Sequence, residues 1–173
     1  SYTVYASWTE ITYPIYFSAN NGTGGPSSPQ YKSYTTNFTI PATVPTRTGY
    51  VFMGWGTAVD STTVSYNPGD TYSTNASISL FAIWGYRVTW DAATNGGTVS
   101  PSYTDVVAGQ AIATAPTPTR LGYTLNTWGQ AFPYTPTAAI TLTATYTANT
   151  YTATFKYQDS VTADTTKTVT YNA

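Results

Sequence analysis

Seven carboxylates and six lysines and arginines are the charged side chains with which this chain could do acid, base or ion chemistry. The chain has no histidine and no cysteine, so it lacks the usual general base, the usual metal ligand and any thiolate. The carboxylates are scattered and form neither a calcium loop nor a convergent catalytic pair. We therefore expect no enzymatic activity, no metal and no cofactor. We assign the acids to turn capping and solubility: Glu10, Asp60, Asp70, Asp91, Asp105, Asp159 and Asp164.

Three lysines raise the possibility of a covalent crosslink, an amide bond between a lysine and an asparagine side chain: Lys32, Lys156 and Lys167. Some surface domains of Gram-positive bacteria carry such a bond. It requires a buried lysine, an asparagine and an acid close together, and the sequence shows no such triad. Solvated lysines are therefore the favoured interpretation, with the crosslink as the alternative.

Three asparagines lie in the Asn-x-Ser/Thr pattern that accepts a glycan on exported proteins: Asn21, Asn37 and Asn75. In a chain this rich in serine and threonine, two or three such matches are expected by chance. The pattern makes glycosylation chemically possible on a surface protein but does not establish it.

Composition excludes several classes of protein. Only 8% of the residues are charged and the formal net charge is -1, which cannot create the positive field that nucleic-acid binding requires. Aromatic residues make up 16% of the chain, with 17 tyrosines, which is too many for a disordered protein. The longest apolar run, residues 80–84, is far shorter than the roughly 20 residues of a membrane helix, so we expect no transmembrane segment.

A motif that occurs twice organises the sequence. Pro45-Thr46-Arg47-Thr48-Gly49-Tyr50 recurs as Pro118-Thr119-Arg120-Leu121-Gly122-Tyr123, at an offset of 73 residues. In both copies Trp-Gly follows after four residues, at Trp55-Gly56 and at Trp128-Gly129. One duplicated unit accounts for both copies.

Two strand-like patterns frame each copy of this motif. An opening pattern at residues 13–17 recurs at 86–90, again at an offset of 73. A closing pattern of leucine, alanine and an aromatic residue at alternate positions ends at Trp84 in the first copy and at Tyr146 in the second. Such alternation is typical of strands, so the sequence predicts a mainly β fold. The sequence also allows one short helix per module, with residues 106–115 as the best candidate, although Gly109 interrupts the pattern there and the matching stretch, residues 34–42, is rich in threonine.

These patterns divide the chain into four segments. Residues 1–10 contain the alternation of Val4, Ala6 and Trp8, and we interpret them as the closing strand of a preceding or partner module. Residues 11–84 and 85–146 are two whole modules. Residues 147–173 are the opening hairpin of an incomplete third module, with strands expected at 151–155 and 167–171.

The motif, its frame strands and the spacing from tyrosine to tryptophan resemble the Listeria-Bacteroides repeat, which is similar to the internalin B-repeat. The resemblance covers nearly the whole chain. It implies small β-grasp-like modules in tandem on a microbial surface protein, with a structural, adhesive or linker role and no catalytic activity. It also implies a set of structural signature residues: Arg47, Gly49, Tyr50, Trp55, Trp84, Arg120, Gly122, Tyr123, Trp128 and Tyr146.

The signature residues have physical roles that the structure can test. Gly49 and Gly122 are expected at positive φ, where a side chain would be penalised. Trp55 and Trp128 have the wrong parity for the core face of their strands. A β-bulge near Gly54 or Thr127 would return each indole to the core.

The two signature arginines, Arg47 and Arg120, allow two interpretations. The favoured one is a guanidinium that stacks on a neighbouring aromatic ring or binds loop carbonyls. The alternative is a binding site for an external carboxylate.

The leading functional prediction is a non-enzymatic extracellular module of a microbial cell-surface protein: a stalk, spacer or filament subunit. Its partners would be neighbouring copies of itself or adjacent repeats of a longer chain. The alternative is an adhesive module that recognises a glycan or a host protein through exposed tyrosine and tryptophan. Buried or dispersed aromatics would favour the first prediction, and a contiguous exposed patch would favour the second.

Overall fold

The structure, a computed structural model, describes residues 1–159 and 161–171. It confirms the predicted mainly β fold. Residues 160, 172 and 173 of the predicted third segment lie outside the described residues. Within the described part of the chain the helix considered over residues 106–115 is absent: β9 ends at Val107, and a turn at Gly109, with φ of 85°, follows.

Residue contacts divide the chain into two compact units. The first contains Ser1–Arg87, Asp105–Gln110 and Pro136–Ala139, and the second contains Val88–Thr104, Ala111–Thr135 and Ile140–Ala173. In chain order the first strands are β1 (Thr12–Ser18), β2 (Thr23–Gly24), β3 (Gln30–Ser33), β4 (Phe38–Thr39), β5 (Pro45–Thr46), β6 (Val51–Gly56), β7 (Thr71–Tyr72) and β8 (Ile78–Asp91), which contains residues of both units. The elements after it are the 3-10 helix η1 (Ala93–Asn95), β9 (Tyr103–Val107), β10 (Tyr123–Thr127), β11 (Ile140–Thr143), β12 (Thr145–Ala148), β13 (Thr150–Phe155) and β14 (Thr165–Thr170).

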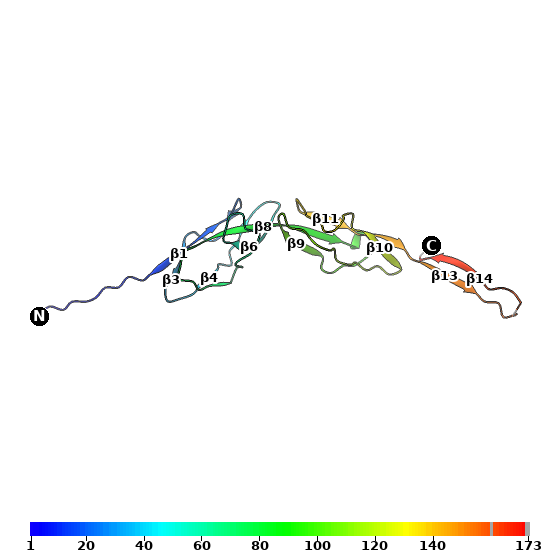
Figure 1. The fold of residues 1–173 in the computed structure, drawn as a ribbon, viewed down its shortest axis with the longest axis horizontal. Coiled ribbons are helices and arrows are strands. Elements are labelled where there is room, and N and C mark those ends of the chain that lie inside the picture. Colours follow the sequence, from blue (N-terminus) through cyan, green and yellow to red (C-terminus); the bar gives the residue numbers. More distant parts are fainter. Residues whose placement is uncertain (160, 172–173) are drawn as a thin grey trace. The chain divides into compact units, whose positions relative to one another are not determined.

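The sheet of the first unit is built around β1 (Figure 1). Strand β3 pairs with β1 in the antiparallel sense on one edge, and the first residues of β8 pair with it in the parallel sense on the other. Strand β6 then pairs with β8 in the antiparallel sense. Two small ladders, β2 with β5 and β4 with β7, complete the unit.

The second unit repeats the central part of this arrangement. Residues 88–91 of β8 pair in the parallel sense with β11. Strands β10 and β12 form an antiparallel pair, and β13 with β14 forms an antiparallel hairpin (Figure 1). The hairpin strands overlap those predicted at 151–155 and 167–171, and β14 begins two residues earlier and ends one residue earlier than predicted.

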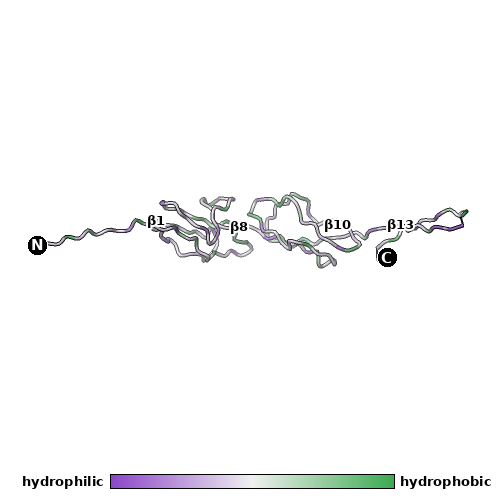
Figure 2. The backbone as a smooth tube through the Cα atoms, turned by 90° about the horizontal axis from the view of Figure 1, so that it is seen from below, coloured by the Kyte–Doolittle hydropathy of each residue, from purple (hydrophilic) through white to green (hydrophobic). Residues whose placement is uncertain are grey.

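The core of the first unit consists of aromatic and aliphatic side chains from alternate strand positions. Trp55 is completely buried and contacts the rings of Phe17 and Phe52, with centroids 5.1 Å and 5.2 Å away. Ile15 and Leu80 are buried beside it in the same cluster. Figure 2 shows the resulting pattern, in which hydrophobic and hydrophilic residues interleave along the chain.

A β-bulge positions each signature indole, as predicted. In β6 the pairing with β8 shifts register between Phe52 and Gly54, and Trp55 then faces the core. In β10 the pairing with β12 shifts between Leu125 and Thr127. The extra residue changes the parity of the strand, and it thereby turns the following side chain to the opposite face.

The core of the second unit has a related composition. Trp128 is 4% exposed and meets the ring of Trp90 at 5.2 Å between centroids. Its Nε1 donates to the carbonyl oxygen of Pro116 at 3.0 Å. Leu142 and Ala144 from the closing strand are buried with it.

The N-terminal segment, residues 1–11, has no regular secondary structure in this chain. Its apolar side chains are exposed, with Val4 at 92% and Trp8 at 90%. The closing strand predicted at residues 1–10 is thus not formed within the chain. Its pairing with a preceding or partner module stays a prediction.

We expect replacement of either core indole, Trp55→Ala or Trp128→Ala, to lower the free energy of unfolding of its unit by about 3 to 5 kcal/mol, because each removes a large buried ring and leaves a cavity. Urea unfolding followed by circular dichroism measures the change. Trp8→Ala is the matched control and should lie within about 0.5 kcal/mol of the parent chain, since that indole is exposed. Unchanged stability in both core variants would contradict the assignment.

The bulge glycine gives a second stability prediction. Gly54 has a φ of 140°, and a Cβ placed on it would collide with the side chain of Val64. We therefore expect Gly54→Ala to destabilise the first unit by about 1 to 3 kcal/mol. Thr127→Ala, at the corresponding position of the second unit, should change stability by less than about 1 kcal/mol. Equal effects at the two positions would refute this account of the glycine.

Candidate functional site

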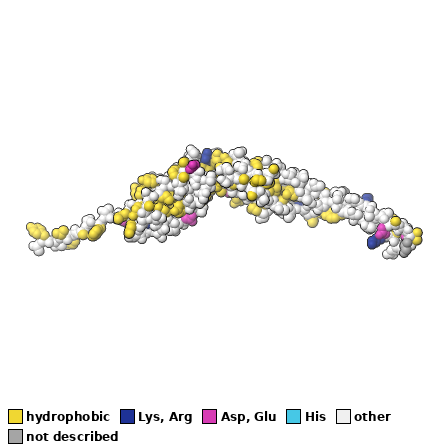
Figure 3. Space-filling model, in the orientation of Figure 1, with side chains coloured by type: hydrophobic (Ala, Val, Ile, Leu, Met, Phe, Trp, Pro, Cys, Tyr) yellow, Lys and Arg dark blue, Asp and Glu magenta, His cyan; other side chains and the backbone are white. Residues whose placement is uncertain are grey.

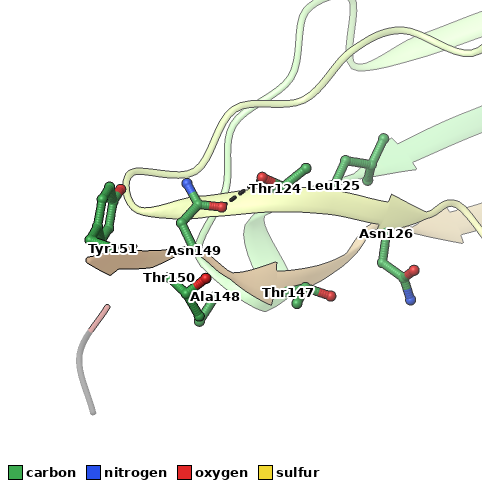
Figure 4. Close-up of a pocket in the computed structure, with 8 residues that line it drawn as sticks. All are labelled: Thr124, Leu125, Asn126, Thr147, Ala148, Asn149, Thr150 and Tyr151. Carbon is green, nitrogen blue, oxygen red and sulfur yellow. Dashed lines mark hydrogen bonds between the residues drawn. The ribbon is translucent and has the colours of Figure 1, made fainter. Parts of the chain in front are cut away.

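Neutral side chains line the open groove beside β10 and β12 (Figure 4). It has a volume of about 590 Å³, and the hydroxyl of Thr124 donates to Asn149 Oδ1 at 2.6 Å beside it. Its lining contains hydroxyl and amide groups but no carboxylate, amine or guanidinium: Thr124, Leu125, Asn126, Thr147, Ala148, Asn149, Thr150 and Tyr151. A general acid paired with a general base cannot be built from this set.

Asp91 caps a turn, and Asp105 takes part in an ion pair. Asp91 accepts hydrogen bonds from the hydroxyl and the backbone N–H of Thr94, which keep the pKa of Asp91 below its usual value of 3.8. Asp105 forms a bidentate ion pair with Arg87, with N to O distances of 2.8 Å and 2.7 Å. Among the described residues no cluster of three or more acids, histidines or cysteines could hold a metal ion.

The signature motif forms the same compact turn in both units. In the first unit the backbone N–H of Tyr50 donates to the carbonyl of Arg47 at 3.1 Å, and Gly49 has a φ of 80°, as predicted. The guanidinium carbon of Arg47 lies 3.8 Å from the centre of the Tyr50 ring. This geometry is the stacking interaction expected of a cation on an aromatic face.

The second copy of the turn has matching dimensions. The backbone N–H of Tyr123 donates to the carbonyl of Arg120 at 3.1 Å, and Gly122 has a φ of 75°. The guanidinium carbon of Arg120 lies 3.6 Å from the centre of the Tyr123 ring and 5.4 Å from that of Tyr146. Both arginines therefore adopt the stacked arrangement, and a carboxylate ligand for either one stays a hypothesis.

A second tyrosine extends the stack in the first unit. The ring of Tyr86 lies 4.8 Å from that of Tyr50, and the Tyr86 hydroxyl donates to the Tyr50 hydroxyl at 3.1 Å. This hydrogen bond, with some desolvation, raises the pKa of Tyr86 above its usual value of 10.0. Burial also raises the pKa of Tyr72 and of Tyr146.

The closing aromatic of each unit packs over a glycine in the loop after the opening strand. A Cβ on Gly22 would collide with the Trp84 ring, and one on Gly97 would collide with Tyr146. Trp84 Nε1 donates to the carbonyl of Asn20 at 2.8 Å. The close approach requires glycine at both loop positions.

Asparagines in the same two loops have a role that the sequence did not reveal. Asn20 Nδ2 donates to the carbonyl of Ala82 at 2.9 Å, and Asn95 Nδ2 donates to the carbonyl of Ala144 at 2.7 Å. Each amide thus fastens the loop to the closing strand. The two asparagines stand 75 residues apart, which departs from the offset of 73 and concealed their equivalence.

The structure corrects the interpretation of Lys32 as a solvated side chain. Lys32 is only 2% exposed, and its Nζ donates to Asn75 Oδ1 at 2.6 Å and to the carbonyl of Ser33 at 2.9 Å. These oxygens compensate a buried ammonium. Lys156 and Lys167 are exposed, as expected.

Lys32 and Asn75 thus supply an adjacent lysine and asparagine, two of the three groups that the alternative of a crosslink requires. No carboxylate of the described residues forms an ion pair with Lys32. The amide crosslink between Lys32 and Asn75 therefore stays a hypothesis. Asn21, Asn37 and Asn75 are all exposed residues, and their glycosylation stays a prediction as well.

The pairing of opening and closing strands is the feature that both units share and that bears most directly on function. In the first unit Ile15 lies opposite Ile78 and Phe17 lies opposite Leu80, in parallel register. Because the two strands run in the same direction, the start of the opening strand β1 and the end of the closing strand β8 lie at opposite ends of the pair.

The second unit has the equivalent pairing. Val88 lies opposite Ile140 and Trp90 lies opposite Leu142, again in parallel. The backbone N–H of Ala144 extends the ladder by donating to the carbonyl of Asp91 at 2.9 Å. Each module is thus entered and left along one parallel pair of strands.

Most tryptophans of the chain are buried, whereas several tyrosines are exposed. Few charged side chains occur on the face shown in Figure 3. Four of the five tryptophans are buried, and Trp8 is exposed in the N-terminal segment. Exposed tyrosines include Tyr16 and Tyr31 on β1 and β3, and Tyr151 on β13.

No helix of the described residues is long and apolar enough to cross a membrane.

The chain is similar in sequence to a known protein family and to an individual known protein. A family model described as the Listeria-Bacteroides repeat domain matches residues 13–83 and 86–150, more than half of the chain. A protein of Evansella cellulosilytica described as "Putative Gly-rich membrane protein" is 29% identical over 135 residues. The match covers 74% of this chain but only 15% of that protein. No solved structure matches the chain.

The tyrosine pair predicts how stability depends on alkaline pH. The pKa of Tyr86 is raised in the folded state, so the unfolded state loses its proton first as the pH increases. This contribution to stability is present below about pH 10, the unfolded pKa, and is lost as the pH rises through the folded pKa. Urea unfolding between pH 8 and pH 12 should show a steeper loss for the parent chain than for Tyr86→Phe. Identical slopes would contradict the proposed hydrogen bond.

Proposed function

Because this chain belongs to the Listeria-Bacteroides repeat family, with two tandem copies of the repeat, we propose that it is a non-enzymatic structural module of a microbial cell-surface protein. Its role would be that of a stalk or spacer outside the cell, carrying other parts of a longer protein. The description of the relative as a membrane protein, together with the small share of that protein that this chain spans, supports an origin in a larger surface-attached chain.

The observation that carries this proposal is the parallel pairing of the opening and closing strands in both units. Tension on a tandem array enters a module at the start of its opening strand and leaves at the end of its closing strand. The two strands are then pulled past one another along their length, so all hydrogen bonds of the ladder resist at once. Such a module resists extension without disulfides, which the chain cannot form because it has no cysteine.

The aromatic core supports the same role. Trp55 and Trp128 are buried in the cores of their units, so their indoles are not available to bind a ligand at the surface. Burying an indole removes on the order of 200 Å² of apolar surface from water. At about 25 cal/mol per Å², this burial contributes several kcal/mol to the stability of the module before the cost in conformational entropy is subtracted. The modules therefore use their large aromatics for cohesion.

A second candidate function, an adhesive module that recognises a glycan or host protein, is favoured by one local feature. Tyr31 lies opposite Pro14, and Tyr16 is two residues further along the same face of β1. Tyr16 is 46% exposed and Tyr31 is 61% exposed. The two exposed phenol rings lie on the same face of the β1 and β3 pair, where they can stack on sugars. Loss of glycan binding in Tyr16→Ala and Tyr31→Ala would establish this alternative.

Single-molecule force spectroscopy tests the stalk proposal, and the absence of native cysteine allows handles to be placed freely. Handles at Thr9→Cys and Thr150→Cys apply tension to both modules through their opening and closing strands. Handles at Thr9→Cys and Ser77→Cys pull instead at the same end of the β1 and β8 pair, which separates the hydrogen bonds one after another. We expect a clearly higher unfolding force with the first pair of handles. Equal forces in the two geometries would overturn the proposal.

A further inference from the structure

A groove in the first unit lies beside the short ladder that joins β2 to β5. It has a volume of about 450 Å³, and all the residues that line it belong to the first repeat. The lining consists of Asn21, Gly22, Thr23, Thr46, Arg47 and Thr48. Binding sites for small molecules span roughly 300 to 1,000 Å³. The groove is therefore large enough to hold one sugar ring with its substituents.

Arg47 is the charged residue of this groove, and its guanidinium has no anionic partner in the described part of the chain. No carboxylate there forms an ion pair with Arg47, and no protein acceptor receives a hydrogen bond from its side chain. The residue is half-buried, and its guanidinium carbon stacks 3.8 Å from the centre of the Tyr50 ring. A guanidinium that is held in place and unpaired can bind a carboxylate through two parallel N–H···O hydrogen bonds.

Neutral polar side chains surround this cation. Thr23 and Thr46 lie opposite each other in the ladder, with their hydroxyl oxygens 3.4 Å apart. Thr48 and Asn21 add a further hydroxyl and an amide, and the lining contains no carboxylate. Hydroxyl and amide groups can both donate and accept hydrogen bonds, as the hydroxyls of a sugar require. One cation among several such groups matches a sugar that carries a single carboxylate.

We propose that this groove binds a hexuronic acid unit of an acidic polysaccharide. The carboxylate of the sugar pairs with the Arg47 guanidinium, and its ring hydroxyls bind the side chains of the threonines and of Asn21. This site is distinct from the exposed tyrosine pair on β1 and β3, which lacks a cation. Binding breaks no strand ladder, so a module that bears load can also carry this site.

The second unit carries the same arginine but a different groove. Leu121, an exposed residue, stands at the position of Thr48. Thr98 and Thr119 form the pair equivalent to that of the first unit, and the groove beside them has a volume of about 320 Å³. The lining of that groove does not include Arg120. Arg120 therefore provides a matched control within the same chain.

A nuclear magnetic resonance titration of the whole chain tests the proposal with sodium glucuronate as the probe. Glucuronate should shift the backbone amide signals of Gly22, Thr23 and residues 46–48, and the shifts should saturate at millimolar concentration. Glucose lacks the carboxylate and sodium acetate lacks the ring hydroxyls, so each should bind at least several-fold more weakly. Shifts that do not saturate, or equal binding of glucuronate and either control compound, would overturn the proposal.

Substitutions supply the second arm of the test. Arg47→Gln should weaken glucuronate binding by about tenfold or more, because it removes a charged hydrogen-bonding group, whereas Arg120→Gln should leave binding unchanged. Because Arg47 also stacks on Tyr50, Thr48→Val separates binding from folding: it removes one exposed hydroxyl with little change in shape and should weaken binding several-fold.

Thr117→Val, in the groove of the second unit, is the control for the threonine variant and should bind glucuronate like the parent chain. Full affinity in Arg47→Gln, equal losses in the two arginine variants, or full affinity in Thr48→Val would each overturn the proposal. The difference in unfolding force between the two pairs of handles does not depend on these results.

Discussion

The parallel ladder between an opening and a closing strand is the constraint on which the rest of this structure depends. Residues at the two ends of a module, such as Phe17 and Leu80, become direct neighbours, so the module closes only when its entire sequence has folded between them. Everything else is arranged against this pair. Strand β6, which contains the bulge, pairs with the closing strand β8. The side-chain amide of Asn20 donates a hydrogen bond to the carbonyl of Ala82 in β8, and the ring of Trp84 packs over the loop at Gly22.

Large aromatic side chains provide the cohesion that a small module otherwise obtains from disulfides or metals. The bulge in each central strand is what makes this possible, because without it Trp55 would face the solvent. The two modules solve the same packing problem with different residues. In the first, Gly54 leaves space for Val64 from a long loop. The second has a shorter loop, and threonine occupies the corresponding position.

Much of this organisation was predictable from the sequence, because periodicity and repetition report strand faces directly. The core positions of Trp55 and Trp128, the two bulges and the positive φ of Gly49 and Gly122 all followed from parity and spacing. The burial of Lys32 did not follow, because its compensation by Asn75 depends on strands distant in sequence. The short helix considered near Gly109 was equally undecidable, since its residues suit either conformation; tertiary pairing holds residues 106–107 in β9, and a turn follows.

Native-state hydrogen exchange tests the central claim most directly, because it measures the free energy of opening for each backbone amide. If the parallel pair closes the module, the slowest amides of the first unit lie in β1 and in residues 78–81 of β8 and exchange only when the whole unit unfolds. Exchange of these amides through local opening, with slower exchange in β3 or β6, would contradict the account.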